Sequence, residues 1–269
     1  MSQLIRSGPR RAGAMRAATL GSLILLIAVI SALGAAGTPA QAGSGPRERV
    51  DQRFTTTRPG TPTGFHFTAS YHAADEADGP PPVLKRMVFT PPHGLRYDTS
   101  VPARCTASDA ELQMLGPDAC PPGSQIGTGT VEGLILVPFA HDVVFDHFKH
   151  DTYLMNAANE QIVLIKSEGF SVVRGKIRRD GTMVWNLPAC FPRPPGGDCA
   201  DDHILQLKTT STIAPYTKTS AGRVHSYAIT PPTCPPGGYW RTTVRYWWAD
   251  GSIDRVPTRQ PCRSPAASR

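Results

Sequence analysis

Phe170-Ser-Val-Val-Arg-Gly-Lys-Ile-Arg-Arg-Asp-Gly-Thr-Met-Val-Trp-Asn-Leu187 is the stretch of sequence that indicates the fold most directly. Its two ends are rich in β-branched and apolar residues, and the dipeptide Asp180-Gly181 separates them. Asp-Gly between two such runs is a strong short-range signal for a β-hairpin with a two-residue loop. The stretch therefore predicts two antiparallel strands, at residues 170–179 and 182–187.

The same strand pattern recurs on both sides of this hairpin. Phe65, Phe67, Ala69 and Tyr71 alternate with polar residues, which gives one apolar face with the period of a β-strand. The run Ile162–Ile165 is apolar on both faces, which predicts a central position in a sheet. Further strand-like runs lie at 83–90, 125–137, 141–149, 151–157, 161–167, 203–212, 223–230, 239–249 and 252–258.

This spacing of short strands predicts an all-β protein. The chain also contains 27 prolines and 25 glycines, which suit turns better than helices. We therefore expect a disulfide-bonded antiparallel β-sandwich, immunoglobulin-like in general architecture. One short helix is predicted at Asp109–Leu115, because Ser108 and Glu111 form a Ser-x-x-Glu capping box and Gly116-Pro117 ends the run.

The first 42 residues have the features of an export signal. Four arginines and no acid accompany an uncharged run, Ala17–Gly37, and Ala40-Gln41-Ala42 fits a signal-peptidase site. This interpretation makes the remaining chain a secreted, extracellular protein. The uncharged run is also just long enough to span a bilayer. The alternative is therefore an extracellular domain that an uncleaved N-terminal helix anchors to the membrane.

Composition divides the chain into four expected segments. Residues 1–42 are the signal peptide, and residues 43–60 are polar and charged enough to predict a flexible leader. Residues 61–263 are expected to form a single β-sandwich domain. Residues 264–269 are expected to be a disordered tail.

All six cysteines follow the signal, and an even number in an exported chain predicts disulfides rather than a metal site. Six cysteines allow fifteen pairings, and the sequence alone does not choose among them. Local geometry favours the sequential set. Cys105 and Cys120 bracket the predicted helix, and Cys190 and Cys199 flank a Pro- and Gly-rich loop. The last pair, Cys234 and Cys262, lies near the open base of a hairpin around Asp250-Gly251.

A pattern around the cysteines resembles a known group of proteins. It consists of Pro102-Ala-Arg-Cys105, Ala119-Cys-Pro121, Ser124-Gln-Ile-Gly-Thr-Gly-Thr130 and Pro231-Pro-Thr-Cys-Pro235, followed by an aromatic hairpin and Cys262. It resembles uncharacterised secreted β-sandwich proteins of high-GC actinobacteria over most of residues 83–262. The resemblance implies a secreted β-sandwich and implies no activity.

Charge and motifs exclude several classes of function. The net charge of +7 includes four of the 28 basic residues in the signal, so the rest of the chain carries only +3. That is too mild for a dedicated nucleic-acid-binding protein. No known catalytic motif is present, so catalytic residues stay unknown. Carboxylate pairs have no local spacing rule, so Glu132, Glu160 and Glu168 leave a secreted hydrolase open as an alternative.

One stretch is rich in potential metal ligands, namely His141, Asp142, Asp146, His147, His150 and Asp151. On a strand, His141 and His147 share a face but stand roughly 20 Å apart. They cannot bind one ion together, and Val143–Phe145 argues against a helix that would gather the others. We therefore interpret the stretch as a solvated strand and turn, and predict no metal and no cofactor.

The first hairpin offers a candidate binding face. A two-residue loop places Lys176 opposite Trp185, so Arg174, Lys176 and Arg178 share a face with that indole. A cationic row beside an aromatic ring suits an anionic polymer. The alternative is that the basic side chains only shelter Trp185 from water.

The last hairpin offers a second candidate face. Alternation predicts a core face with Trp240, Val244, Tyr246 and Trp248. The other face then carries Tyr239, Arg241, Thr243, Arg245 and Trp247. Aromatic residues mixed with arginine are typical of ligand and partner surfaces, although a second packed face is the alternative.

These observations predict an exported, non-catalytic binding protein of the cell envelope. Its expected partner is a cell-wall polymer or an envelope protein, bound through the faces around Trp185 or Trp247. The alternatives are a secreted hydrolase with a carboxylate or metal site, and a purely structural envelope protein. No nucleic-acid partner is expected, and membrane contact is expected only if the signal is uncleaved.

Overall fold

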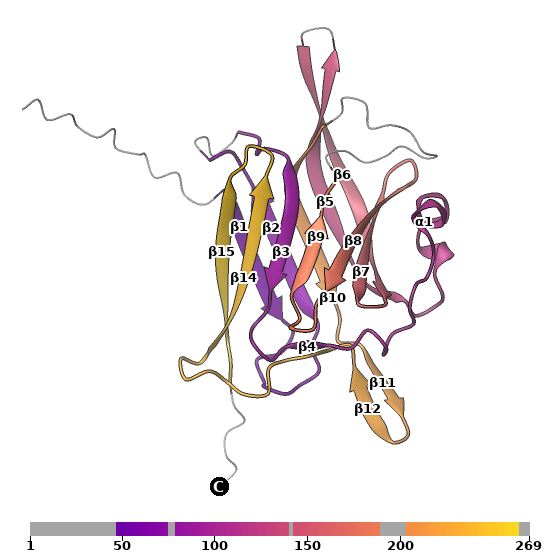
Figure 1. The fold of residues 1–269 in the computed structure, drawn as a ribbon, viewed down its shortest axis with the longest axis vertical. Helices are drawn as coiled ribbons and strands as arrows, with labels where there is room; N and C mark the ends of the chain where they lie inside the picture. Colours follow the sequence, from indigo (N-terminus) through magenta and orange to yellow (C-terminus); the bar gives the residue numbers. More distant parts are fainter. Residues whose placement is uncertain (1–46, 75–78, 140–141, 189–202, 264–269) are drawn as a thin grey trace, which may run out of the picture. The chain divides into compact units, whose positions relative to one another are not determined.

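The computed structural model describes residues 47–74, 79–139, 142–188 and 203–263. The predictions for the signal peptide, the C-terminal tail, His141 and the Cys190–Cys199 pair lie outside these residues. Within the described ranges, no helix is both long and apolar enough to cross a membrane. The predicted all-β antiparallel fold with one short helix is confirmed (Figure 1).

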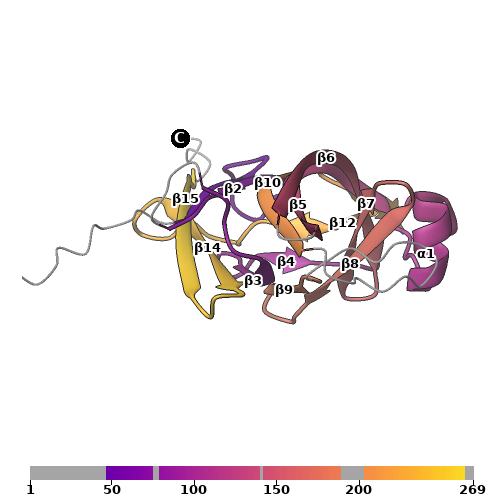
Figure 2. The ribbon, with the colours of Figure 1, turned by 90° about the horizontal axis from the view of Figure 1, so that it is seen from above.

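Eleven strands form one antiparallel sheet in the order β1-β2-β10-β5-β6-β7-β8-β9-β3-β14-β15. Their bounds are β1 Glu48–Phe54, β2 Phe65–Tyr71, β3 Leu84–Thr90, β5 Gln125–Phe139, β6 Asp142–Ala157, β7 Glu160–Lys166, β8 Phe170–Ile177, β9 Met183–Asn186, β10 His203–Ile213, β14 Tyr239–Trp248 and β15 Ile253–Pro261. Two small ladders pair β4 (Arg96–Tyr97) with β13 (Ala228–Ile229), and β11 (Thr217–Ser220) with β12 (Arg223–Ser226). Seen from above, β2, β10, β5 and β6 face β14, β3 and β9 across the core, as the layers of a sandwich do (Figure 2).

The sheet is nearly closed, because its two edge strands, β1 and β15, meet. The Gln260 side chain donates to the carbonyl oxygens of Phe54 (2.9 Å) and Thr56 (3.1 Å), and accepts from the Phe54 amide. Nearby, the Thr242 hydroxyl donates to the Gln52 side chain at 2.9 Å. The Gln260 side chain therefore pairs backbone groups that an open edge would leave free for aggregation. We call this contact of β1 with the β14–β15 hairpin the seam.

The prediction of a flexible leader at residues 43–60 is wrong for Glu48–Phe54, which is strand β1. Its core face carries Glu48 and Gln52, both almost fully buried, beside Val50 and Phe54. Two of the polar residues that suggested a leader, Glu48 and Gln52, therefore accept hydrogen bonds at the seam. Their partners lie some 200 residues later, so no local pattern could show this.

The loops of both Asp-Gly hairpins hold three residues rather than the predicted two. In the first, the Arg178 amide donates to the Thr182 carbonyl at 2.8 Å, and Gly181 adopts a φ of 81°. In the second, the Trp248 amide donates to the Ser252 carbonyl at 3.1 Å. Such loops combine a type I turn with a left-handed glycine. The extra residue shifts the pairing of the two strands by one position. Each side chain therefore shares a face with a residue next to its predicted partner, and not with that partner.

The predicted helix is confirmed as α1 (Asp109–Leu115), including its capping box and its end at Gly116. A 3₁₀ turn, η1 (Gly116–Ala119), follows, and a disulfide joins Cys105 to Cys120 around both. This segment covers the outer face of β7 and β8, where Ile162 and Leu164 are fully buried. The central position predicted for Ile162–Ile165 is thus confirmed, because the opposite face of β7 lies against the core.

A second disulfide joins Cys234 to Cys262, as the sequential pairing predicted. It fastens the end of β15 to the segment before β14. The two disulfides indicate an oxidising, extracellular environment.

Candidate functional site

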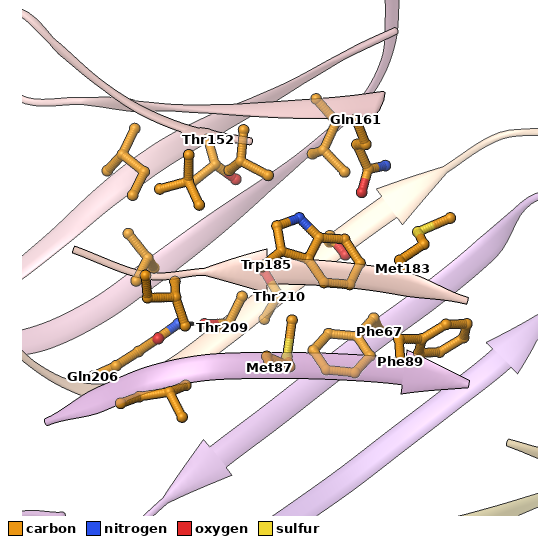
Figure 3. A pocket seen from close by; sticks show the side chains of 18 of the residues that line it. Phe67, Met87, Phe89, Thr152, Gln161, Met183, Trp185, Gln206, Thr209 and Thr210 are labelled. Atoms are coloured by element: carbon orange, nitrogen blue, oxygen red, sulfur yellow. Dashed lines mark hydrogen bonds between the residues drawn. The ribbon is translucent and has the colours of Figure 1, made fainter. Parts of the chain in front are cut away.

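A cavity of about 110 Å³ lies inside the nearly closed sheet. Its lining comes from both layers, with β2, β5, β6, β7 and β10 on one side and β3, β8 and β9 on the other. Most lining side chains are apolar, among them Phe67, Met87, Phe89, Met183 and Trp185 (Figure 3). A somewhat larger apolar cavity, of about 150 Å³, can stay dry and accept benzene.

Trp185 forms one wall of this cavity, and a glycine holds it there. Gly175 on β8 is the register partner of Trp185 on β9. A Cβ atom at position 175 would overlap Nε1 and Cε2 of the indole. The absence of a side chain therefore lets the indole lie against the β8 backbone, and only 8% of Trp185 is exposed.

Replacing Gly175 with alanine is expected to push the indole out of place. Overpacking of this kind costs about 1–3 kcal/mol of unfolding free energy. Urea denaturation measures the loss, and Gly237→Ala is the matched control because a Cβ at Gly237 meets no atom within 4 Å. Equal stabilities of the two variants would show that Trp185 does not depend on Gly175.

The prediction that Trp185 shares a face with Arg174, Lys176 and Arg178 is wrong. Lys176 lies opposite Val184, whereas Trp185 points into the cavity. The three-residue loop causes the difference. The predicted cationic row therefore lies on the outside, away from the indole.

Arg174 is held by acidic partners rather than free on the surface. Its guanidinium contacts Asp109 at 2.7 Å and Glu160 at 3.2 Å, and donates to the Ala107 carbonyl at 3.1 Å. These bonds, together with burial that opposes them, leave the pKa of Arg174 above its ordinary value. The residue fastens α1 to β7 and β8. Lys176 and Arg178 are exposed.

One polar side chain in the cavity wall lacks a partner. Gln161 on β7 is 3% exposed, and its Nε2 atom has no hydrogen-bond partner within the described part of the chain. Figure 3 shows it on the wall across from Trp185 and Met183. A buried donor without a partner costs about 1–3 kcal/mol, so a ligand with an acceptor atom would recover that loss.

The other polar groups of the wall are hydroxyls and amides. The Gln206 amide bonds to Thr209, and the hydroxyl of Thr210 pairs with Thr130 at 2.8 Å. Burial raises the pKa of the Tyr71 phenol well above its ordinary value, so it stays neutral. The described cavity lining includes no carboxylate, imidazole, thiol or amine.

The residues behind the hydrolase alternative are dispersed in the structure. Glu132 pairs with Lys149 at 3.0 Å, Glu160 pairs with Arg174, and Glu168 is exposed. The bond from Lys149 lowers the pKa of Glu132. Over the residues whose placement is described, no three His, Cys, Asp or Glu side chains gather as metal ligands would.

The two faces predicted for the last hairpin are confirmed. Trp240, Val244, Tyr246 and Trp248 are each at most 2% exposed and belong to the core. On the other face, Arg241 and Arg245 are exposed and Trp247 is half-buried. This outer face is separate from the cavity.

Comparison with known proteins adds no relationship to this geometry. No family model, curated protein or solved structure matches the chain.

The cavity and the residues that line it were not predicted from the sequence. The sequence pattern indicated Trp185 as a binding residue, but predicted the wrong side chains beside it. The inward position of Gln161 follows from its place two residues before Val163 and four before Ile165, which face the core.

Proposed function

We propose that this protein is an exported, non-catalytic binding protein that holds a small apolar group inside its sheet. The observation that carries the proposal is the apolar cavity with the unpaired amide of Gln161 in its wall. The sequence of residues 1–42 supports export, and the disulfides suit the compartment that export reaches.

The expected ligand is a compact ring or a short branched chain that carries one hydrogen-bond acceptor. A volume of about 110 Å³ limits the buried part to roughly the size of benzene. The Nε2 group of Gln161 is a donor, so a carbonyl or ether oxygen of the ligand can accept from it. A single neutral hydrogen bond contributes about 0.5–1.5 kcal/mol, which corresponds to a preference of roughly 2- to 13-fold.

Two probes of equal shape test this proposal, cyclopentanone and methylenecyclopentane. They differ only in the oxygen that would accept from Gln161. We expect both to raise the thermal midpoint of the wild-type protein by mass action, and the ketone to bind more tightly. In Gln161→Leu the ketone should lose its advantage while the hydrocarbon binds as before or better.

A cavity-filling variant provides the second arm. Val163→Phe places a larger side chain in the cavity wall and should abolish binding of both probes. Val224→Phe makes the same change on β12, where the side chain is 65% exposed, and should bind as the wild type does. Binding that survives Val163→Phe would place the probes elsewhere and overturn the proposal.

A further inference from the structure

The outer face of β3, β14 and β15 carries five arginines. The register of the last hairpin places Arg241 directly opposite Arg259, and Arg245 directly opposite Arg255. All four are exposed. On the neighbouring strand, the guanidinium of Arg86 lies 5.0 Å from the centre of the Trp247 ring. We call these five side chains and Trp247 the arginine face.

The arginine pairs are unfavourable for the sheet itself. Like charges directly opposite each other on neighbouring strands destabilise the pairing. Arg174 and Arg47 meet acids in this fold, but the described residues supply no ion-pair partner for any arginine of this face. An arrangement that costs stability and recurs twice on one hairpin indicates an external anionic partner.

The acids near this face are engaged elsewhere. Asp254 on β15 alternates to the core side, where it accepts from the Trp248 indole and contacts Arg47. In the turn, Asp250 contacts Arg47 at 2.8 Å. Beyond the seam, Asp51 on β1 pairs with Arg53 at 2.9 Å. The arginine face therefore keeps its full positive charge.

We propose that the arginine face binds a linear anionic polysaccharide. Guanidinium groups bind carboxylate and phosphate groups in a planar, bidentate manner. Arg241 and Arg245 are four residues apart, so the two arginine pairs repeat at roughly 13 Å along the strands. A chain with regularly repeated charges can contact both pairs, and Trp247 and the half-exposed Tyr239 offer aromatic surface to its sugar rings. This proposal is independent of the cavity.

The test uses the whole secreted protein with polygalacturonate, and with neutral dextran of similar length as the uncharged probe. We expect saturable binding of polygalacturonate that weakens as salt rises, and no binding of dextran. In the double variant Arg245→Gln with Arg255→Gln, affinity should fall about tenfold or more. The thermal midpoint of this variant should stay the same or rise, because an opposed pair of like charges is removed.

The matched control removes the same charge from another exposed site, as Lys176→Gln with Arg178→Gln on the β8–β9 hairpin. This control should bind as the wild type does. An equal loss in both double variants would show that net charge alone drives binding and would overturn the proposal. Tighter binding to duplex DNA or to vesicles of anionic phospholipid than to polygalacturonate would also overturn it.

Discussion

Replacing Glu48 with glutamine is expected to remove most of the pH dependence of this protein's stability between pH 5 and 9. The wild-type protein should lose stability across the same interval. The loss is on the order of 4 kcal/mol of unfolding free energy, because one pKa unit corresponds to about 1.4 kcal/mol.

The cause is a buried pair of carboxyl groups at the seam. Glu48 is 1% exposed, and the Trp248 indole donates both to its Oε1 (3.1 Å) and to Oδ2 of Asp254 (2.8 Å). The other oxygen of Glu48 is buried without a partner among the described residues. Burial, and then the charge of Asp254, raise the pKa of Glu48 from 4.5 to about 8. Glu48 is therefore protonated in the folded protein at neutral pH.

The sign of the effect follows from proton uptake. Between pH 4.5 and 8 the folded state holds a proton on Glu48 that the unfolded state has released. The free energy of unfolding then decreases as pH rises. The contribution of Glu48 is complete below pH 4.5 and is lost as pH passes through 8. Asp250, whose pKa its bonds to Ser252 and Arg47 lower to about 2, acts oppositely but only below about pH 4.

Urea denaturation of the wild type and of Glu48→Gln at pH 5, 7 and 9 measures this difference. Groups that titrate in both proteins cancel in the comparison. Glu168→Gln, which changes an exposed glutamate, should follow the wild-type curve. A constant separation between wild type and Glu48→Gln at all three pH values would show that Glu48 ionises normally in the folded state.

Features that depend on a few neighbouring residues could be predicted from the sequence. The capping box at Ser108 and Glu111 specifies α1, because both of its hydrogen bonds form within four residues. The alternation from Phe65 to Tyr71 likewise determines which face of β2 is buried. The face assignment of the last hairpin was correct because it used only alternation along one strand, and did not depend on which residues pair.

Predictions that depended on which residues pair between strands were less accurate. The Asp-Gly dipeptides at 180–181 and 250–251 correctly indicated hairpins, but Asp-Gly fits a two-residue loop and a three-residue loop alike. In both turns the aspartate side chain accepts from the amide two residues later, at Thr182 and at Ser252. That bond could not be anticipated from composition. The resulting one-residue shift moved Trp185 from a surface face into the cavity wall.

The seam and the cavity could not be predicted because they join residues far apart in the chain. Gln260 closes the sheet onto Phe54 across 206 positions. The cavity likewise collects side chains from eight strands, and its volume depends on how completely they pack. On the arginine face, the sequence indicated Arg241, Arg245 and Trp247. Only the register added Arg86, Arg255 and Arg259.

Replacing both Cys234 and Cys262 with alanine is expected to lower the free energy of unfolding by about 3.6 kcal/mol. Their sequence separation is 28 residues, and the chain-entropy relation for a loop of that size gives this value at 25 °C. For a domain of roughly 200 residues, the loss corresponds to a thermal midpoint lower by about 7–14 °C. Differential scanning calorimetry under non-reducing conditions measures it.

Removing this disulfide should raise the entropy of the unfolded chain, and should also weaken one part of the folded protein. Cys262 is 8% exposed and packs in the cluster that contains Phe54 and Trp240, and its amide donates to Gly238 at 2.8 Å. Gln260 of the seam is only two residues away. Without the bond, the end of β15 should open first, so amide exchange at Phe54 should accelerate more than exchange in β7.

Cys105→Ala with Cys120→Ala is the control, because that pair lies beside α1 and should leave Phe54 protected. Equal acceleration at Phe54 in both double variants would contradict a local role of the Cys234–Cys262 bond in holding the seam.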